Sequence, residues 1–163
     1  MNRRLKMYID YKRELCSLTE DKSTLTDGLL SPLDGYISDA NFLQHDLNSE
    51  WRPIVYDSRE VGFLIVVSGS LVTTGTDYEV AESYVEPEFR RKGLMTKAVY
   101  DFALSHPGTY GLDIMKEPGA IGKSFWPTIP DGKRIIQVGG IVESKDRTGD
   151  DCLLMRFKTG ENI

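Results

Sequence analysis

The chain has 163 residues, of which 40% carry hydrophobic side chains, and its formal net charge is −5 at pH 7. This length suits one hydrophobic core, so we expect a single domain over residues 1–163. Because nucleic-acid binding needs a concentrated excess of Lys and Arg, the acidic balance argues against direct nucleic-acid binding. It suits a positively charged small acceptor better.

Apolar runs such as residues 63–67 are far shorter than the roughly 20 residues that a membrane-spanning helix needs. The first residues lead into no apolar secretory segment, so we expect a cytoplasmic protein without a membrane partner. Cys16 and Cys152 lie far apart, with no CxxC spacing and no neighbouring histidine. We therefore interpret both as free structural thiols and expect no metal site.

The N-terminal third begins with an alternating pattern over residues 5–11. Its apolar members are Leu5, Met7, Ile9 and Tyr11. A two-residue period predicts a strand with one buried face. Residues 16–50 are rich in turn-forming side chains, and we expect a short helix at residues 39–47 behind the capping residue Ser38.

Three strands and a helix are predicted next. Residues 51–56 and 61–68 are separated by turn-forming residues, which indicates a hairpin. A second turn leads into a strand at residues 78–85. From Gly93 the apolar positions repeat at helical spacing until Pro107 ends the helix.

The remaining sequence predicts a strand at residues 110–115 and an irregular helix or turn at residues 119–126. A final pair of strands is expected at residues 135–143 and 151–158. The sequence shows no internal repeat and no low-complexity segment.

Residues 85–96 carry the chemical signal. They read Val-Glu-Pro-Glu-Phe-Arg-Arg-Lys-Gly-Leu-Met-Thr and lie between a predicted strand and a predicted helix. Such a junction exposes backbone N–H groups at the start of a helix, where the helix dipole also favours anions. Gly93 lets the backbone approach a phosphate without a Cβ in the way, and Arg90, Arg91 and Lys92 add positive charge. The segment therefore predicts a pyrophosphate site.

This segment resembles the cofactor loop of the GNAT superfamily of N-acetyltransferases. The signature of that family is Arg or Gln, two residues, Gly, one residue, then Gly or Ala. Arg90, Gly93 and Met95 stand at the three positions, and Met95 departs from the small residue of the pattern. The lead-in and the order of elements also fit the family over residues 51–126. The resemblance implies an α/β (α+β) fold of GNAT type, with a mixed, mostly antiparallel central sheet flanked by helices.

The same resemblance implies acetyl-CoA as co-substrate. The backbone of residues 83–85 would pair with the pantetheine arm, and the amides of residues 91–96 would hold the pyrophosphate. The implied cofactor-binding residues are Ser83, Tyr84, Val85, Arg90, Arg91, Lys92, Gly93, Leu94, Met95 and Thr96.

Some group should help to deprotonate the acceptor, because removing the proton from an alkylammonium of pKa near 10.4 costs about 4.6 kcal/mol at pH 7. GNAT enzymes often use a carboxylate on the strand before the cofactor loop, at the position matched by Glu79. Others use an acid on the following strand, where Asp113 matches. Glu82 is a third candidate, and simple alternation puts it on the opposite strand face from Glu79.

The general acid of the family is usually a tyrosine, at a position matched here by Phe125, and an asparagine seven residues earlier is matched by Pro118. Phe125 has no hydroxyl with which to protonate the CoA thiolate. Because a thiol has a pKa of about 8.5, the thiolate can leave without help. Tyr84 and Tyr110 are the alternative hydroxyl donors.

The function that this resemblance implies is direct transfer of an acetyl group from acetyl-CoA to a primary amine of a small-molecule or protein acceptor. The alternative is a catalytically degenerate GNAT-like domain with a binding or assembly role, which the departures at Met95, Pro118 and Phe125 suggest. A homodimer is compatible with either hypothesis.

Overall fold

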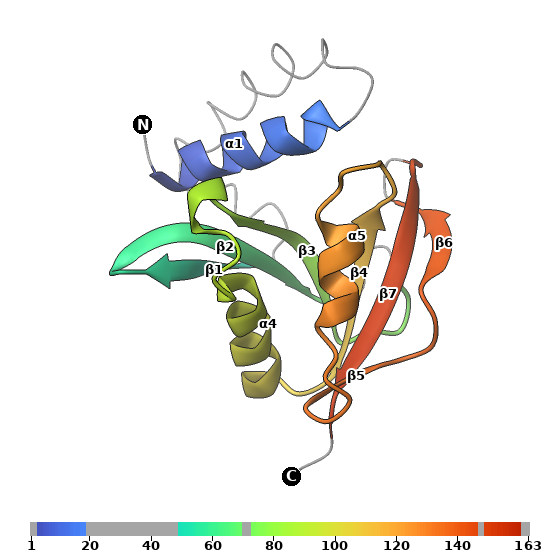
Figure 1. The fold of residues 1–163 in the computed structure, drawn as a ribbon. Coiled ribbons are helices and arrows are strands. Elements are labelled where there is room, and N and C mark those ends of the chain that lie inside the picture. The colour runs from blue at the N-terminus through green and yellow to red at the C-terminus, as the bar shows by residue number, and fades with distance from the viewer. Residues whose placement is uncertain (1–2, 19–48, 70–72, 147–148, 161–163) are drawn as a thin grey trace.

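The structure is a computed structural model and describes residues 3–18, 49–69, 73–146 and 149–160 (Figure 1). In chain order its elements are α1 (Arg3–Ser17), β1 (Ser49–Tyr56), β2 (Arg59–Ser68), β3 (Tyr78–Val85), the 3-10 helix η2 (Pro87–Phe89), α4 (Leu94–Ser105), β4 (Thr109–Met115), α5 (Gly122–Phe125), the 3-10 helix η3 (Trp126–Thr128), β5 (Ile135–Gln137), β6 (Val142–Lys145) and β7 (Asp151–Thr159). The helix expected at residues 39–47 lies outside the described residues.

The strands form one sheet in the order β1-β2-β3-β4-β7-β5, and β6 also pairs with β7. The pairs are antiparallel except for β3 and β4, which run parallel. This topology confirms the mixed, mostly antiparallel sheet that the resemblance implied.

The expected hairpin is present and turns at Asp57 and Ser58, whose φ angles are +52° and +62°. Two consecutive left-handed residues are typical of a tight two-residue hairpin loop, because their twist matches that of the flanking strands. The predicted strand at residues 78–85 coincides with β3, and the predicted helix after Gly93 is α4.

The N-terminal segment is the helix α1, so the strand expected at residues 5–11 was wrong. Residues four apart share one face of a helix. Met7 and Tyr11 form one buried stripe, which packs on the sheet. Leu5 and Ile9 form a second buried stripe. Two such stripes interleave along the sequence, so a helix that is buried on two sides shows the alternation of a strand.

The strand expected at residues 135–143 was also wrong in part, because the structure divides it into β5 and β6. Both short strands pair with β7. Between them Gly139 takes a φ of +69°, a left-handed conformation that interrupts an extended strand.

In the described part of the chain, hydrophobic cores lie on both faces of the sheet, and side chains of β2 alternate between the two faces. Leu64 and Val66 belong to the core beneath α4. Phe63 and Ile65 belong to the core beneath α1. Figure 1 shows α1 lying across the sheet beside the end of β3, where the chain enters η2.

Candidate functional site

The strands β3 and β4 are neighbours that separate. Their parallel register consists of Tyr78 with Tyr110 and Glu79 with Gly111. Beyond Glu79, β3 stays paired with β2 on its other side, and β4 stays paired with β7 (Figure 1). The sheet therefore opens between β3 and β4 towards their C-terminal ends. There, β3 turns backbone N–H and C=O groups towards the opening, and these groups can pair with an extended ligand.

A β-bulge in β3 sets which side chains face this opening. The register with β2 pairs Ile65 with Glu82 and Val66 with Val80, which leaves Ala81 as the extra residue. An extra residue reverses the alternation of faces. Glu82 therefore lies on the same face as Glu79, the α1 side, and the prediction that the two lie on opposite faces was wrong.

The carboxylate of Glu79 is held in a buried polar cluster. Glu79 is 1% exposed, and its Oε1 accepts hydrogen bonds from the backbone N–H of Thr73 at 2.8 Å and from the hydroxyl of Thr73 at 2.6 Å. The Thr73 side chain packs over Gly111, where an added Cβ would come within 2.1 Å of its hydroxyl oxygen. Glu79 thus anchors Thr73, in the segment that precedes β3, at the point where β3 and β4 still pair.

Glu82 lies three residues further along β3 and forms an ion pair with a lysine of α1. Its Oε1 is 2.5 Å from the Nζ of Lys12. The same Nζ lies 5.3 Å from the ring centroid of Tyr8 and 5.3 Å from that of Tyr11. A carboxylate and two aromatic faces therefore surround one alkylammonium group, which is a favourable arrangement for a cation.

Asp113, on β4, is the third carboxylate of the site. Together with Glu79 and Glu82 on β3 it forms what we call the acidic group. Its neighbour Ile114 lies in the core beneath α4, so Asp113 faces the α1 side. Burial raises the pKa of the Asp113 carboxyl above its usual range. The negative charges of Glu79, Asp146 and Glu82 raise that pKa further. Asp113 can therefore hold a proton at a higher pH than an ordinary aspartate, which suits a general base.

The segment after β3 forms an open backbone cradle. Arg91 and Gly93 take φ angles of +63° and +74°, and α4 begins directly after Gly93 without a side-chain cap. The first helical hydrogen bond of α4 is donated by the backbone N–H of Lys97 to the Gly93 carbonyl. Among the described residues the amides of residues 94–96 have no acceptor, and an added Cβ on Gly93 would meet no atom within 4 Å. Free amides, a helix dipole and open space fit a phosphate group.

The side chain of Arg90 points away from that cradle. Its guanidinium donates to the Val85 carbonyl at 2.7 Å and lies 5.4 Å from the Tyr84 ring. Its two terminal nitrogens bind both carboxylate oxygens of Glu14 in α1, at 2.9 and 2.5 Å. The exposed Arg91 and Lys92, the latter near the Tyr56 ring, remain as the cations of the loop.

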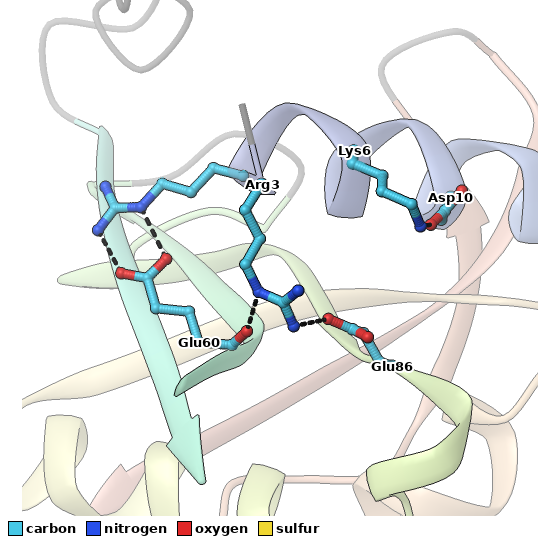
Figure 2. Close-up of polar contacts among 6 residues, drawn as sticks. Arg3, Lys6, Asp10, Glu60 and Glu86 are labelled. Atoms are coloured by element: carbon cyan, nitrogen blue, oxygen red, sulfur yellow. Dashed lines mark hydrogen bonds and ion pairs between the residues drawn. The ribbon is translucent and has the colours of Figure 1, made fainter. Parts of the chain in front are cut away.

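The other end of α1 is fastened beside the same loop. Figure 2 shows Arg3 donating to the Glu60 carbonyl at 2.7 Å and to the Glu86 carboxylate at 2.6 Å. Arg4 adds two bonds to the Glu60 carboxylate, at 2.9 and 2.7 Å. Helix α1 is therefore tied to both ends of the lead-in between β3 and α4.

The sequence analysis did not predict that α1 contributes to the site, and it gave no role to Lys12 or Glu14. The signal was the spacing of Met7, Tyr11 and Leu15, which lie four residues apart and all pack in the core beneath α1. That spacing is helical, and it would have predicted α1.

The tyrosines proposed as proton donors differ in their surroundings. Tyr110 donates its hydroxyl to the His106 carbonyl at 2.6 Å in the core beneath α4. Phe125 packs against the same core. Tyr84 packs beneath α1, where burial raises the pKa of its hydroxyl to about 12. Tyr84 is therefore the one of these three rings that lies on the face of the acidic group.

Three further features concern metals, membranes and thiols. In the described part of the chain, no three His, Cys, Asp or Glu side chains gather as a metal site. None of the described helices combines the length and the hydrophobicity of a membrane-spanning segment. Cys152 is a free, buried thiol, and burial raises its pKa to about 11, so it is poorly ionised at neutral pH.

Three solved structures that resemble this chain are described as acetyltransferases. The PaiA N-acetyltransferase from Thermoplasma acidophilum, solved in complex with coenzyme A, is 17% identical over 94% of this chain and 92% of its own, with a TM-score of 0.56. A putative GNAT-family acetyltransferase from Desulfovibrio desulfuricans is 15% identical over 92% of this chain and 91% of its own, with a TM-score of 0.52. Aminoglycoside 6'-acetyltransferase type Ii is 16% identical over 98% of this chain and 94% of its own, with a TM-score of 0.52.

No protein-family model and no curated protein matches the sequence. The structural likeness extends over nearly the whole chain at low identity, so it establishes the fold. This chain has the GNAT fold, and the resemblance indicated by residues 85–96 is confirmed at that level.

Proposed function

We propose that this chain is a single-domain, acyl-CoA-dependent N-acetyltransferase that transfers an acetyl group from acetyl-CoA to a primary amine. One observation carries the proposal. The free edge of β3 is followed, after the short lead-in that contains η2, by a helix N-terminus whose amides are unpartnered among the described residues and whose Gly93 faces open space. An edge followed by an anion cradle matches a ligand with an extended amide arm and a pyrophosphate.

The cofactor-binding residues follow from that match. The amides of residues 91–96 would hold the pyrophosphate, and Arg91 and Lys92 would add charge at the rim. The backbone of residues 83–85 would pair with the pantetheine arm. Because the arm runs back along β3 from the cradle, its thioester end lies towards Glu82 and the bulge at Ala81. Arg90 acts indirectly, since it fixes the lead-in to α1.

The acidic group supplies the proton chemistry. The acceptor arrives as an ammonium ion and must lose one proton before its nitrogen attacks the thioester carbonyl. We assign Glu82 to binding the ammonium and Asp113, whose pKa burial raises, to accepting the proton. A C–N bond forms, the C–S bond breaks, and CoA leaves as a thiolate. The nitrogen releases its second proton to solvent, and the thiolate takes one proton from solvent to become the thiol. Glu79 is 1% exposed, so we assign it to shaping the site and raising the Asp113 pKa.

The acceptor class follows from the same residues. Carboxylates and tyrosine faces favour an aliphatic ammonium over a neutral or anionic acceptor. One structural neighbour is an aminoglycoside acetyltransferase, whose name specifies an amine of this general kind. We therefore propose a cationic alkyl amine, carried by a small molecule or by a protein, as the acceptor of this chain.

Titration calorimetry with acetyl-CoA and CoA tests the cofactor site, and release of the CoA thiol on a panel of alkyl amines tests the reaction. We expect binding of both nucleotides and turnover on at least one diamine or amino sugar. An absence of binding at millimolar acetyl-CoA would overturn the proposal. Binding without turnover on any amine would favour the degenerate GNAT-like domain, for which the missing hydroxyl at Phe125 is the specific observation.

A further inference from the structure

Lys12 places an alkyl amine inside the proposed acceptor site. Its Nζ contacts Glu82 at 2.5 Å and lies over the rings of Tyr8 and Tyr11, and its side chain is 26% exposed. Lys6, on the same helix, is different. Its side chain is 66% exposed, and its Nζ contacts Asp10 of its own helix at 2.8 Å. Lys12 is thus held on the sheet, whereas Lys6 lies on the solvent side of α1.

The contact with Glu82 fixes where this amine lies along β3. Glu82 follows the bulge at Ala81, beyond the last parallel pair between β3 and β4. If acetyl-CoA binds as proposed above, this is where its thioester end arrives. The inference therefore rests on the proposed function, which supplies the acetyl donor.

A primary amine beside a thioester and a proton acceptor is itself an acetyl acceptor. We propose that Lys12 is a self-acetylation site, modified within its own chain. The Lys12 ammonium gives one proton to the neighbouring carboxylates, from which it passes to solvent. The free Nζ then attacks the acetyl carbonyl, the amide C–N bond forms, and the thioester C–S bond breaks. The products are Nε-acetyl-lysine, CoA thiol and one proton.

The modification changes the site electrostatically. Acetylation removes the positive charge of Lys12 and with it the ion pair to Glu82. Glu82 then has no cation from α1 and is available to the ammonium of an external acceptor. Self-acetylation of this lysine thus coincides with release of the carboxylate that binds substrate.

The test is peptide mapping by mass spectrometry after the full chain is incubated with acetyl-CoA. We expect one acetyl group, on Lys12, added about 100-fold faster than on the matched control Lys6, because a held amine reacts as in a unimolecular step. The rate constant should not change with protein concentration. The variant K12R, which keeps the charge beside Glu82, should lose the label and still bind acetyl-CoA in calorimetry.

Four outcomes would overturn the inference. Equal labelling of Lys6 and Lys12 would mean unspecific chemical acetylation, and a rate that rises with protein concentration would mean transfer between molecules. No label on Lys12, in a protein that binds acetyl-CoA and acetylates an external amine, would remove the inference alone. No label together with no binding of acetyl-CoA would remove the proposed function as well.

Discussion

Arg90 and Glu14 form a bidentate ion pair that joins the cofactor loop to α1, with both terminal guanidinium nitrogens on the two carboxylate oxygens. The two residues are 76 positions apart in the sequence. Arg90 occupies the first position of the GNAT signature, yet its charge is directed to a helix rather than towards the cradle. We therefore propose that its role in ligand binding is to position the lead-in to the loop.

This geometry predicts that E14Q weakens the binding of acetyl-CoA. The Gln side chain cannot form the charged pair, so the loop is held less firmly. The pair is partly exposed, so we expect a loss of about 1 kcal/mol or less, up to about a fivefold rise in Kd. Calorimetry of the wild type and E14Q measures this change.

A direct phosphate contact by Arg90 would give the opposite result. In that case E14Q would free the guanidinium and remove a negative charge, and the affinity would rise. D10N is the matched control, because Asp10 forms an exposed ion pair with Lys6 on the same helix instead of an ion pair with Arg90. Its affinity should equal that of the wild type.

Gly93 and Gly75 form a matched pair for testing the cradle. Both take a φ of +74°, and an added Cβ at either position would meet no atom within 4 Å. Each Gly→Ala change should therefore cost about the same in unfolding free energy, about 1–2 kcal/mol for a left-handed alanine. We expect G93A alone to lose acetyl-CoA binding, because its Cβ would project into the space assigned to the phosphate. Urea unfolding and calorimetry on both variants check this.

Loss of binding in both variants would indicate a general effect of stability on affinity. Retention of wild-type affinity in G93A would mean that the phosphates bind elsewhere. Comparison of G93A with G75A at a temperature well below both melting transitions separates these outcomes.

Much of the fold around the loop could be predicted because local residues determine it. Pro87 cannot donate a backbone hydrogen bond to a continuing strand, Gly93 permits the left-handed residue before α4, and Pro107 follows the last helical turn. These residues act on their own backbone, so the boundaries of β3 and α4 are visible in the sequence.

The candidate site depends on features that local sequence does not carry. The bulge at Ala81 arises from the register between β2 and β3, and no neighbouring residue type marks it. The contact between Lys12 and Glu82 joins residues 70 positions apart. Alternation therefore assigned Glu82 to the wrong face, and the side chains that α1 contributes were missed.

The raised pKa of Asp113 predicts that D113N stabilises the protein at neutral pH. A group whose folded pKa exceeds its unfolded value contributes stability below the unfolded pKa, which is 3.8 here, and that contribution is lost as the pH rises through the folded pKa. D113N removes the charged form, so its advantage over the wild type should be absent near pH 3 and reach a plateau at neutral pH. Urea unfolding across this range measures it.

Asp77 provides a control of opposite sign. Hydrogen bonds from the backbone and the hydroxyl of Thr109 lower the pKa of its carboxyl. Its contribution is present above the unfolded pKa and is lost as the pH falls through the folded pKa. D77N should therefore destabilise the protein at neutral pH and lose that effect on acidification. A destabilising D113N at neutral pH would contradict the assignment of a burial cost to the Asp113 charge.

The last prediction separates the three carboxylates by their kinetics. D113N should lower kcat by a factor of about 10² to 10⁴, the usual range for a lost general base, while acetyl-CoA binding is kept. E82Q should act mainly on KM for the amine, because it removes a partner of the bound ammonium. E79Q should change both parameters little, because the Gln oxygen can still accept a hydrogen bond from Thr73 and the side chain is 1% exposed. Initial rates of thiol release over a range of amine concentrations measure the two parameters.

The pH dependence of the reaction rate also tests whether Asp113 is the general base. As the pH approaches the pKa of the amine, solvent removes the ammonium proton and a protein base is no longer needed. The rate of D113N should therefore keep rising with pH and approach the wild-type rate, which levels off earlier, above the raised pKa of Asp113. A drop of 10² or more in E79Q at neutral pH, with D113N near wild type, would transfer the role of base to Glu79, the residue that the family pattern favours. Such a result would require the cluster around Thr73 to open when substrate binds, which protection of the Thr73 amide from hydrogen exchange can measure directly.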